Sequence, residues 1–374
     1  MEKRLLLASP HMSDEGYELA YIHDAFQKNW IAPLGENVNE FEKAMRVYMG
    51  EGYPVAMSAG TAALHLAMLL ADVKPGDTVF CQSLTFSASA NPVTYCGGKP
   101  VFIDSERETW NMDPDALETA FAQYGKPKAV VVVHLYGNPA KLDVITEICA
   151  AHGVPLIEDA AEGLGSAFKG QKCGTFGKFG ALSFNGNKII TTSGGGMLIC
   201  ETEADAKHAL KLATQAREAY PWYQHEEIGY NYRMSNISAG IGRGQMHVLP
   251  LRVEQKKEIF ARYAKNLADL PVTMQPKLSC AESNRWLSVL LLDTDCGVTP
   301  ADILTQLAEN NMEGRYLWKP MHLQPIFADC PFVHVAGSPV SDDLFARGVC
   351  LPSDTKMTME DVDSVCDVIR RMFR

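Results

Sequence analysis

Short, almost continuously apolar segments alternate with amphipathic segments through the first two-thirds of this chain. Six of the apolar segments have the length and composition of buried strands, at residues 78–82, 100–104, 129–134, 155–159, 179–184 and 196–200. Helical patterns lie between them, at residues 61–71, 114–124 and 142–152. Asp113 and Pro114 form a helix start, and Gly153 is typical of a helix end. This alternation predicts an α/β domain with a mostly parallel sheet.

After about residue 250 the regular alternation of strand and helix patterns ends. We assign one strand pattern and three helical patterns there, at 286–293 for the strand and at 252–266, 301–310 and 359–373 for the helices. We therefore expect a large α/β domain over residues 1–250 and a smaller α+β domain over residues 251–374. A length of 374 residues is in keeping with two domains of ordinary size.

Charge and composition exclude several classes of partner. The net charge of −11 argues against a nucleic-acid surface, so an anionic ligand would require a local cationic site. The apolar run at 5–8 is too short for a signal sequence or a membrane span, and no other segment approaches eighteen apolar residues. The ten cysteines show no CxxC pair and no metal-ligand spacing, which is typical of reduced thiols in a cytoplasmic protein. We expect no metal, no nucleic acid and no membrane partner.

Ligands of open α/β sheets bind beyond the carboxyl ends of the strands, so the residues there are the first candidates for a site. Gly60 and Thr61 open the helix predicted at 61–71. A helix N-terminus at such a turn can hold a phosphate, although an ordinary capped helix explains the same residues. Phe86 follows the strand at 78–82, where it can stack on a flat ring or simply pack in the core.

Two further strand ends carry ionisable residues. Asp159 and Glu162 follow the strand at 155–159, where a carboxylate can hold a protonated heterocycle nitrogen or a metal ion. Acids that favour a helix N-terminus are the alternative, and the lack of a second cluster weakens the metal reading. Lys188 follows the strand at 179–184 and precedes three consecutive glycines. A desolvated lysine can form a Schiff base with an aldehyde, whereas most lysines are merely exposed.

The common nucleotide and hydrolase motifs are missing from the sequence. There is no GxGxxG after a strand, no GxxxxGK[ST] and no GxSxG. A dinucleotide-dependent dehydrogenase, a P-loop enzyme and an α/β-hydrolase are therefore poor interpretations of this chain.

Taken in order, eight segments of the chain resemble one family of enzymes. They are SAGTAALHLAM, SLTFSASANP, KPVFID, HLYGNPAKLD, IEDAAEGLGS, GTFGKFGALSFNGNKIITTSGGGML, GYNYRMSN and LWKPMH. The sequence resembles the DegT/DnrJ/StrS-type nucleotide-sugar aminotransferases along essentially its whole length. The resemblance implies the aspartate-aminotransferase-like fold type I of pyridoxal 5'-phosphate (PLP) enzymes, with a mostly parallel sheet in the large domain. It also implies a PLP cofactor that alternates with pyridoxamine phosphate.

The same resemblance assigns roles to individual residues. Lys188 would bond covalently to the cofactor and move a proton, and Asp159 would bond the protonated pyridine nitrogen. Glu162 stands where the family often has glutamine or histidine near the ring hydroxyl, which alters the local charge. The remaining cofactor contacts implied are Phe86 on the ring, Gly60, Thr61 and Ser183 on the phosphate, and Asn231 on the phosphate of a neighbouring subunit. The last role implies a homodimer with shared active sites.

Within the family, the chain looks most like enzymes that make precursors of UDP-N-acetylbacillosamine for bacterial glycans. That resemblance implies L-glutamate as the donor and carbon 4 of UDP-2-acetamido-4-keto-2,6-dideoxyglucose as the acceptor. The residues expected near the sugar nucleotide are Trp30, Asn187, Arg315, Lys319 and His322. A TDP- or GDP-linked keto-sugar or the axial-amine product is the alternative within this class, and a non-catalytic nucleotide-sugar-binding module is the alternative outside it.

Overall fold

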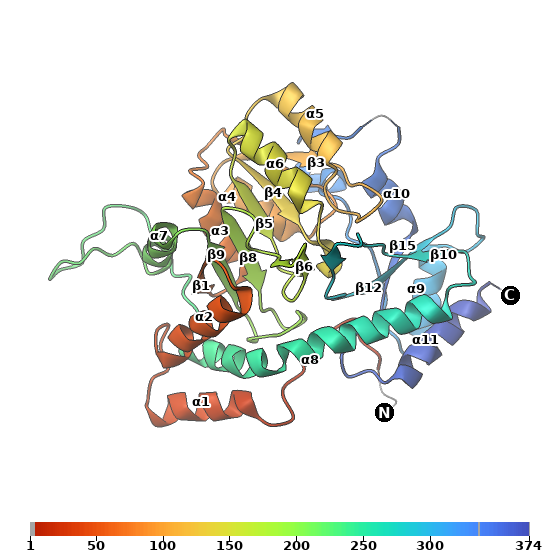
Figure 1. Cartoon of the computed structure of the whole chain (residues 1–374), viewed down its shortest axis with the longest axis horizontal. Coiled ribbons are helices and arrows are strands. Elements are labelled where there is room, and N and C mark those ends of the chain that lie inside the picture. The colour runs from red at the N-terminus through yellow and green to blue at the C-terminus, as the bar shows by residue number, and fades with distance from the viewer. Residues whose placement is uncertain (1–3, 336, 374) are drawn as a thin grey trace.

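The centre of the computed structural model, which describes residues 4–335 and 337–373, is an eight-stranded sheet (Figure 1). Strand β9 (Gly196–Cys200) runs antiparallel to both of its neighbours, and the other strands of the sheet are parallel to one another. In spatial order the strands are β1 (Tyr53–Met57), β9 (Gly196–Cys200), β8 (Phe179–Ser183), β5 (Leu156–Asp159), β4 (Ala129–Val133), β2 (Thr78–Gln82), β3 (Lys99–Ile103) and β14 (Phe332–Val333). The mostly parallel α/β sheet predicted from the sequence is confirmed.

Helices cover both faces of this sheet, because its strands are apolar on both sides. In β4, Ala129 and Val131 pack toward the helices α3 (Gly60–Leu70) and α7 (Glu203–Ala213), whereas Val130 and Val132 pack toward α5 (Pro114–Tyr124) and α6 (Leu142–His152). The helices of this part of the chain are α1 (Tyr17–Gln27), α2 (Glu36–Met49), α3 (Gly60–Leu70), α4 (Asn91–Tyr95), α5 (Pro114–Tyr124), α6 (Leu142–His152) and α7 (Glu203–Ala213). The expected helix ends are also present, since Asp113 caps α5 by accepting from the N–H of Asp115, and Gly153 ends α6 in the left-handed region at φ 62°.

A second, antiparallel sheet lies beside the first and corresponds to the α+β structure predicted for the later residues. Its strands, in order, are β10 (Val272–Met274), β12 (Ser288–Leu292), β15 (Gly348–Leu351) and β13 (Arg315–Tyr316). The helices α9 (Pro300–Glu309) and α11 (Met359–Arg371) pack on it together with α8 (Asn236–Asn266), and α10 (Val340–Arg347) lies nearby. Leu5, from the other end of the chain, belongs to the same core.

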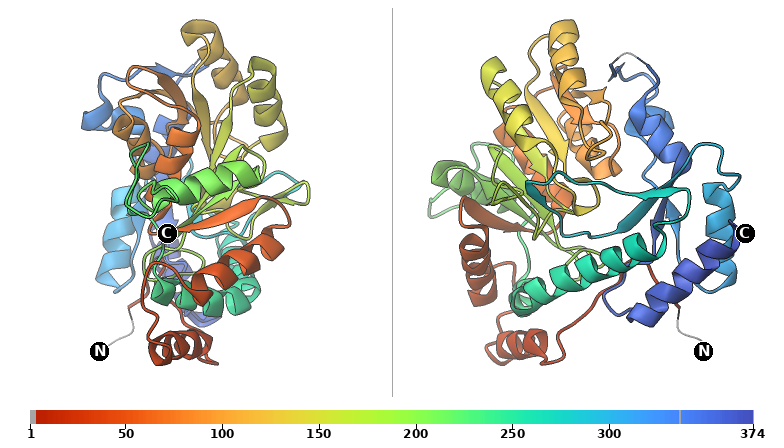
Figure 2. Two further views of the ribbon diagram at one scale, coloured as in Figure 1. Left: turned by 90° about the vertical axis from the view of Figure 1, so that its left-hand side faces the viewer. Right: turned by 45° about the vertical axis from the view of Figure 1, so that its right-hand side comes forward.

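The helix α8 (Asn236–Asn266) connects the two sheets and is twice as long as the helix expected at 252–266 (Figures 1 and 2). Its first half contains Pro250 and three glycines, which do not suggest a helix from sequence alone. Tight packing explains the glycines. A Cβ at Gly242 would lie 2.7 Å from the Phe41 ring, and one at Gly244 would lie 2.6 Å from the backbone of Glu18. The domain boundary predicted at residue 250 falls within this helix and stays a prediction.

Smaller elements complete the described chain. A three-stranded sheet has the order β11 (Ala281–Glu282), β6 (Ala167–Phe168) and β7 (Gln171–Lys172). Four single turns of 3-10 helix are η1 (Ser87–Ser89), η2 (Leu135–Gly137), η3 (Met321–Leu323) and η4 (Pro325–Phe327). In the part of the chain that the structure describes, no helix is long and apolar enough to cross a membrane.

Candidate active site

The carboxyl ends of β2, β5 and β8 and the N-terminus of α3 meet around one cavity of about 300 Å³. These strands lie close together in the sheet, so residues that are far apart in sequence converge there. Nine of the residues singled out from the sequence line this cavity: Gly60, Thr61, Phe86, Asp159, Glu162, Ser183, Asn187, Lys188 and Arg315. Cavities of this size hold small cofactors and substrates.

Lys188 lies on the loop between β8 and β9, with only 13% of its side chain exposed. Its Nζ is 3.7 Å from Glu162 Oε1 and 4.1 Å from the centre of the Trp286 ring. The amine is therefore held in a mostly desolvated position with a carboxylate on one side and an aromatic face on the other. Such a lysine is suited to react with an aldehyde.

Asp159 ends β5 and is buried in the wall of the same cavity. Ser89 Oγ donates to Asp159 Oδ2 at 2.5 Å, and the backbone N–H of Ala161 donates to Oδ1 at 3.1 Å. A carboxylate oxygen can accept more than one hydrogen bond, so these two donors leave capacity for a further donor from the cavity. The carboxylate can thus hold a protonated ring nitrogen.

Glu162 is buried beside Lys188 and is held in place by two other donors. The N–H of Tyr136 donates to Oε2 at 2.7 Å, and Nε1 of Trp318 donates to Oε1 at 3.3 Å. Burial raises the pKa of Glu162, while Lys188 and the Tyr136 hydrogen bond oppose that rise. The glutamate therefore shares one oxygen between Trp318 and the catalytic candidate Lys188.

The N-terminus of α3 provides a place for a phosphate. The helix begins at Gly60, its N-cap is Ala59, and no side chain caps it. A Cβ at Gly60 would lie 3.0 Å from the Ser183 Cβ, and one at Gly196 would lie 2.4 Å from the backbone of Gly60. The close approach of these backbones leaves free N–H groups and a small hydroxyl side chain facing the cavity, which is an arrangement that binds phosphate.

Three aromatic side chains complete the cavity wall, and two of them had no role assigned from the sequence. Phe86 lies at the end of β2 and is mostly exposed toward the cavity, with its ring 6.5 Å from that of Trp318. Trp318 also contacts Trp286, whose ring centre is 6.5 Å away. Trp286 comes from a segment about one hundred residues after Lys188, and its only sequence signal was its position as the first residue of the strand predicted at 286–293.

The residues expected near the sugar nucleotide divide into two groups. Asn187 and Arg315 line the cavity, and the Arg315 guanidinium is exposed and bonds Glu313 at 3.0 Å. Lys319 is exposed and does not line it. His322 lies outside it as well, because Ser83 bonds its Nδ1 at 2.7 Å and Asp342 bonds its Nε2 at 3.0 Å.

His322 is also enclosed by its surroundings. Its ring stacks on Phe332 at 3.6 Å between centres. Burial lowers the pKa of His322, and Asp342 partly offsets that effect. These contacts give His322 a place in the packing between η3 and the edge of the large sheet.

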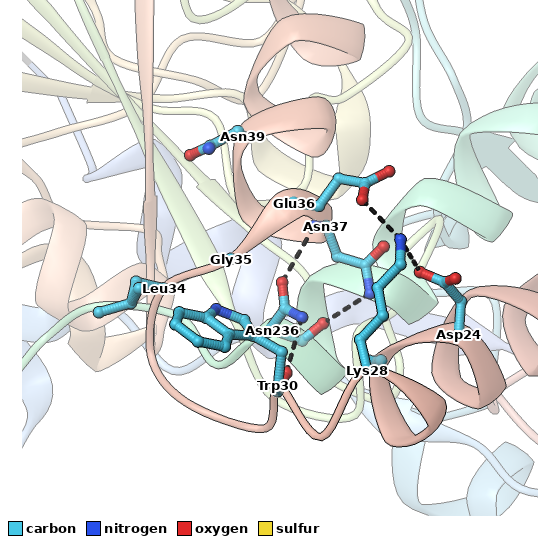
Figure 3. A pocket seen from close by; sticks show the side chains of 10 residues that line it. Asp24, Lys28, Trp30, Leu34, Gly35, Glu36, Asn37, Asn39 and Asn236 are labelled. Atoms are coloured by element: carbon cyan, nitrogen blue, oxygen red, sulfur yellow. Dashed lines mark hydrogen bonds and ion pairs between the residues drawn. The ribbon is translucent and has the colours of Figure 1, made fainter.

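Trp30 lines a different hollow of about 540 Å³ between α1, α2 and the start of α8 (Figure 3). Asn236 donates to the Trp30 carbonyl at 2.9 Å and accepts from the N–H of Asn37 at 3.0 Å. These bonds join the start of α8 to α2 and to the loop between α1 and α2. Lys28 pairs with Asp24 and Glu36 at the rim. The amine of Lys28 is half-exposed and already paired with two carboxylates, so we place the chemistry at the more buried Lys188.

Asn231 is exposed and does not line the cavity of its own chain. It lies in a long loop, residues 214–232, that we call the arm and that projects beyond α7 (Figure 1). Lys211 of α7 fixes the base of the arm through Glu218 at 2.5 Å and Glu227 at 2.8 Å. A role for Asn231 in the site of a neighbouring subunit stays a prediction.

Other buried polar groups near the site have structural partners. Glu158 accepts hydrogen bonds from His134 and from the backbone N–H groups of Gly174, Phe176 and Gly177, which fixes the loop between β7 and β8. Among the described residues, no three His, Cys, Asp or Glu side chains come together as metal ligands.

Comparison with known proteins identifies the family. The model of the DegT/DnrJ/EryC1/StrS aminotransferase family matches residues 13–370. This chain belongs to that family. EpsN of Bacillus subtilis (strain 168), named as an inferred pyridoxal phosphate-dependent aminotransferase, is 52% identical over 100% of this chain and 97% of its own. GDP-perosamine synthase of Escherichia coli O157:H7 is 34% identical over 96% of each chain.

A solved structure agrees with this assignment. A DegT/DnrJ/EryC1/StrS aminotransferase from Brucella abortus is 28% identical, covers 96% of each chain and superposes with a TM-score of 0.89. The fold type I architecture expected from the sequence is thus confirmed, and the chain is a PLP-dependent nucleotide-sugar aminotransferase. PLP suits the cavity, since an amine, a buried carboxylate and an uncapped helix N-terminus match its aldehyde, ring nitrogen and phosphate.

Proposed function

We propose that this enzyme transfers an amino group from L-glutamate to carbon 4 of UDP-2-acetamido-4-keto-2,6-dideoxyglucose. The product would be UDP-4-amino-4,6-dideoxy-N-acetylglucosamine, a precursor for bacterial glycans. The observation that carries the proposal is the placement of Lys188, Asp159 and the N-terminus of α3 around one cavity. That placement offers one group for each reactive part of the cofactor.

We assign the chemical steps to residues of this chain as follows. When bound, PLP supplies an aldehyde that exchanges the amino group and a ring that withdraws electrons from the neighbouring carbon. Lys188 would hold the cofactor in the resting enzyme, and its freed amine would carry a proton between the donor or sugar carbon and the cofactor. Asp159 keeps the ring nitrogen protonated through a charge-assisted hydrogen bond, typically about 1.5–3 kcal/mol. Glu162, whose Oε1 lies 3.7 Å from the Lys188 Nζ, favours the charged form of that amine when the carboxyl is ionised.

The nucleotide is the open part of the proposal, and two observations bear on it. The segments around Trp30, Lys188 and Arg315 resemble enzymes that act on UDP-linked acetamido sugars. The 34% identity to a GDP-perosamine synthase favours a GDP-linked keto-sugar as the second candidate. In either case the diphosphate is anionic, and Arg315 is the cation besides Lys188 among the residues that line the cavity. We assign Arg315 to the diphosphate and Asn187 to the sugar.

We extend the proposal to a homodimer in which each subunit completes the site of the other. The arm carries four large hydrophobic side chains that are exposed in the single chain, namely Tyr220, Trp222, Tyr223 and Ile228. Several exposed large hydrophobic side chains on one projecting loop are typical of an interface. Burial of the arm against a second copy would bring Asn231 toward the partner cavity. The free thiols of the ten cysteines are consistent with a cytoplasmic location.

The deciding experiment begins with the purified enzyme converted to its pyridoxamine form by L-glutamate, followed by removal of the keto acid. Candidate nucleotide keto-sugars are then added one at a time while the cofactor absorbance is recorded. Return of the original spectrum with the UDP-acetamido keto-sugar alone supports the full proposal. Return with a GDP- or TDP-sugar keeps the reaction and replaces the substrate, and no bleaching by L-glutamate refutes the donor. The Lys188→Ala variant should neither turn over nor retain cofactor after borohydride treatment.

A further inference from the structure

Trp286 is fixed directly beneath the amine of Lys188. The Lys188 Nζ lies 4.1 Å from the ring centre, and Trp286 is almost completely buried. The indole Nε1–H donates to the carbonyl oxygen of Asn187 at 2.7 Å, so the ring is tied to the residue that precedes Lys188. The aromatic ring is therefore tied directly to the loop that carries Lys188.

A single buried amide holds both walls of the lysine site. Asn284 Oδ1 accepts from the N–H of Trp286 at 2.8 Å, and its Nδ2 donates to the carbonyl oxygens of Glu162 at 2.8 Å and Leu164 at 2.7 Å. Asn284 is fully buried. The side chain thus connects the residue that carries the aromatic face to the residue that carries the carboxylate, although more than one hundred residues separate them.

The backbone around Asn284 is shaped for this contact. Arg285, between Asn284 and Trp286, has a φ of 53° in the left-handed region, which is uncommon for a residue with a side chain. Gly137 has a φ of +84°, and a Cβ there would lie 1.7 Å from Asn284 Oδ1. Unusual backbone geometry of this kind persists only where the surrounding contacts impose it, and it is concentrated at functional sites. The turn is therefore built to present Trp286 to Lys188.

We propose that the face of Trp286 is the resting place of the free Lys188 ammonium and that Asn284 is the positioning residue that holds it there. The inference rests on the proposed function, since Lys188 is free only after it releases the cofactor. An aromatic face attracts an ammonium ion but has no proton to exchange. It keeps the amine within the cavity whether or not Glu162 is ionised, whereas the attraction of Glu162 depends on its own charge, and burial raises its pKa.

Other ionisable groups also face Lys188, and each contributes to the charge around its amine. On the cavity side they are Asp159, Glu162 and Arg315, and on the opposite side, across a small polar space, they are His11 and Lys256. The hydrogen bonds of Trp286 join it to Asn284 and Asn187, and not to any of these ionisable side chains. Changes at Trp286 therefore alter the aromatic contribution while these charges remain.

The test measures the reactivity of Lys188 in cofactor-free protein prepared from the holoenzyme. Trinitrobenzenesulfonate labels neutral amines, and peptide mass analysis isolates the labelling rate of Lys188 as a function of pH. Loss of the aromatic face in Trp286→Leu should move the midpoint to lower pH by about one unit, which makes labelling about tenfold faster below both midpoints. Trp286→Phe should restore most of the parent profile. Asn284→Ala should shift the midpoint in the same direction as Trp286→Leu.

Two control variants distinguish this role from a structural one. Val289→Ala removes buried volume from the same core cluster without touching Lys188, and Trp222→Leu removes an exposed tryptophan of the arm. Both should leave the labelling profile unchanged. If Trp286→Leu folds and labels as the parent does, the inference is overturned, and the same holds if its shift equals that of Val289→Ala.

The holoenzyme separates this inference from the proposed function. If PLP gives the parent protein a chromophore that borohydride fixes to Lys188, an unchanged labelling profile in the Trp286 variants overturns only the resting place. If no such chromophore forms, the proposed function fails first and the inference fails with it.

Discussion

Ser89 donates a hydrogen bond of 2.5 Å to Asp159 Oδ2, and both side chains are buried at the edge of the cavity. Ser89 is itself bonded by Thr85 at 2.7 Å, so a short chain of hydroxyl groups leads from the end of β2 to the carboxylate. Two neighbouring loops thus fix the orientation of Asp159 before any ligand binds. Asp159, the carboxylate assigned to the ring nitrogen, ends β5 but is oriented by residues that follow β2.

We expect Ser89→Ala to weaken cofactor binding without removing it. Loss of a hydrogen bond to a charged group costs about 1.5–3 kcal/mol, which corresponds to roughly a tenfold or greater rise in the Kd for PLP. Titration of the cofactor-free protein with PLP, followed by absorbance, measures the effect. Ser87→Ala is the matched control, because Ser87 lies in the same turn η1 but is not bonded to Asp159. Equal affinities for the two variants would contradict a role for Ser89 in orienting Asp159.

The buried carboxyl of Glu162 predicts a pH-dependent stability. Burial raises its pKa above the ordinary value of 4.5, so the folded protein binds this proton more tightly than the unfolded chain. The contribution of Glu162 to stability is therefore greatest at low pH and is lost as pH rises from about 4.5 through the folded pKa. Glu162→Gln has no proton to lose at this position. The free energy of unfolding of the variant, relative to that of the parent, should therefore increase as the pH rises over this range.

Urea unfolding of cofactor-free protein at several pH values measures the difference between parent and Glu162→Gln. Glu226→Gln serves as the control, since it makes the same substitution at a glutamate that is exposed on the arm. A constant difference for Glu162→Gln would show that the carboxyl titrates normally.

Lys256 of α8 is a second buried amine with an unusual environment. Its Nζ donates to the carbonyl oxygen of Ser353 at 2.5 Å, and burial lowers its pKa to about 7, partly offset by Asp354. Because the unfolded chain holds this proton up to about pH 10.5, the folded protein loses stability as pH falls from about 10.5 to 7. Lys256→Met removes that loss, so its free energy of unfolding relative to the parent should be higher at pH 7 than at pH 10.

Chemical denaturation at these two pH values tests the prediction. The lost hydrogen bond to Ser353 lowers the stability of the variant by the same amount at both pH values, so it cancels when the two differences between variant and parent are compared. Lys257→Met is the matched control, since Lys257 neighbours it on the same helix but is partly exposed and paired with Glu254. A pH dependence that is the same in both variants would mean that Lys256 is charged in the folded protein at pH 7.

Much of the sheet could be predicted from the sequence, because each central strand is buried on both faces. The six apolar runs coincide with β2, β3, β4, β5, β8 and β9 to within one residue at each end. The strands β1 and β14 were missed, since β1 contains Pro54 and is only partly buried, and β14 has two residues. The first half of α8 was missed because its glycines serve the packing of α1 and α2, which no local pattern reveals.

The site divides in the same way. Gly60, Asp159 and Lys188 could be predicted because the carboxyl ends of neighbouring parallel strands share one edge of the sheet. Trp286 and Asn284 come from the segment that leads into the second sheet, and only the tertiary fold returns them to Lys188. His322 was expected near the sugar from its motif alone, whereas its hydrogen bonds with Ser83 and Asp342 hold it elsewhere.

Arg315 and Lys319 give a paired test of how the sugar nucleotide is bound. Both are exposed cations on the same segment, but Arg315 lines the cavity and Lys319 does not. A charge-assisted contact with a diphosphate is worth about 1.5–3 kcal/mol, so Arg315→Glu should raise the KM for the sugar nucleotide by roughly tenfold or more. The KM for L-glutamate should change much less in the same variant. Lys319→Glu should have a small effect on both constants, because its ammonium lies outside the cavity. Steady-state kinetics with each substrate varied in turn measures this, and equal effects of the two substitutions would show that the surface charge of the whole segment, rather than a contact at Arg315, attracts the nucleotide.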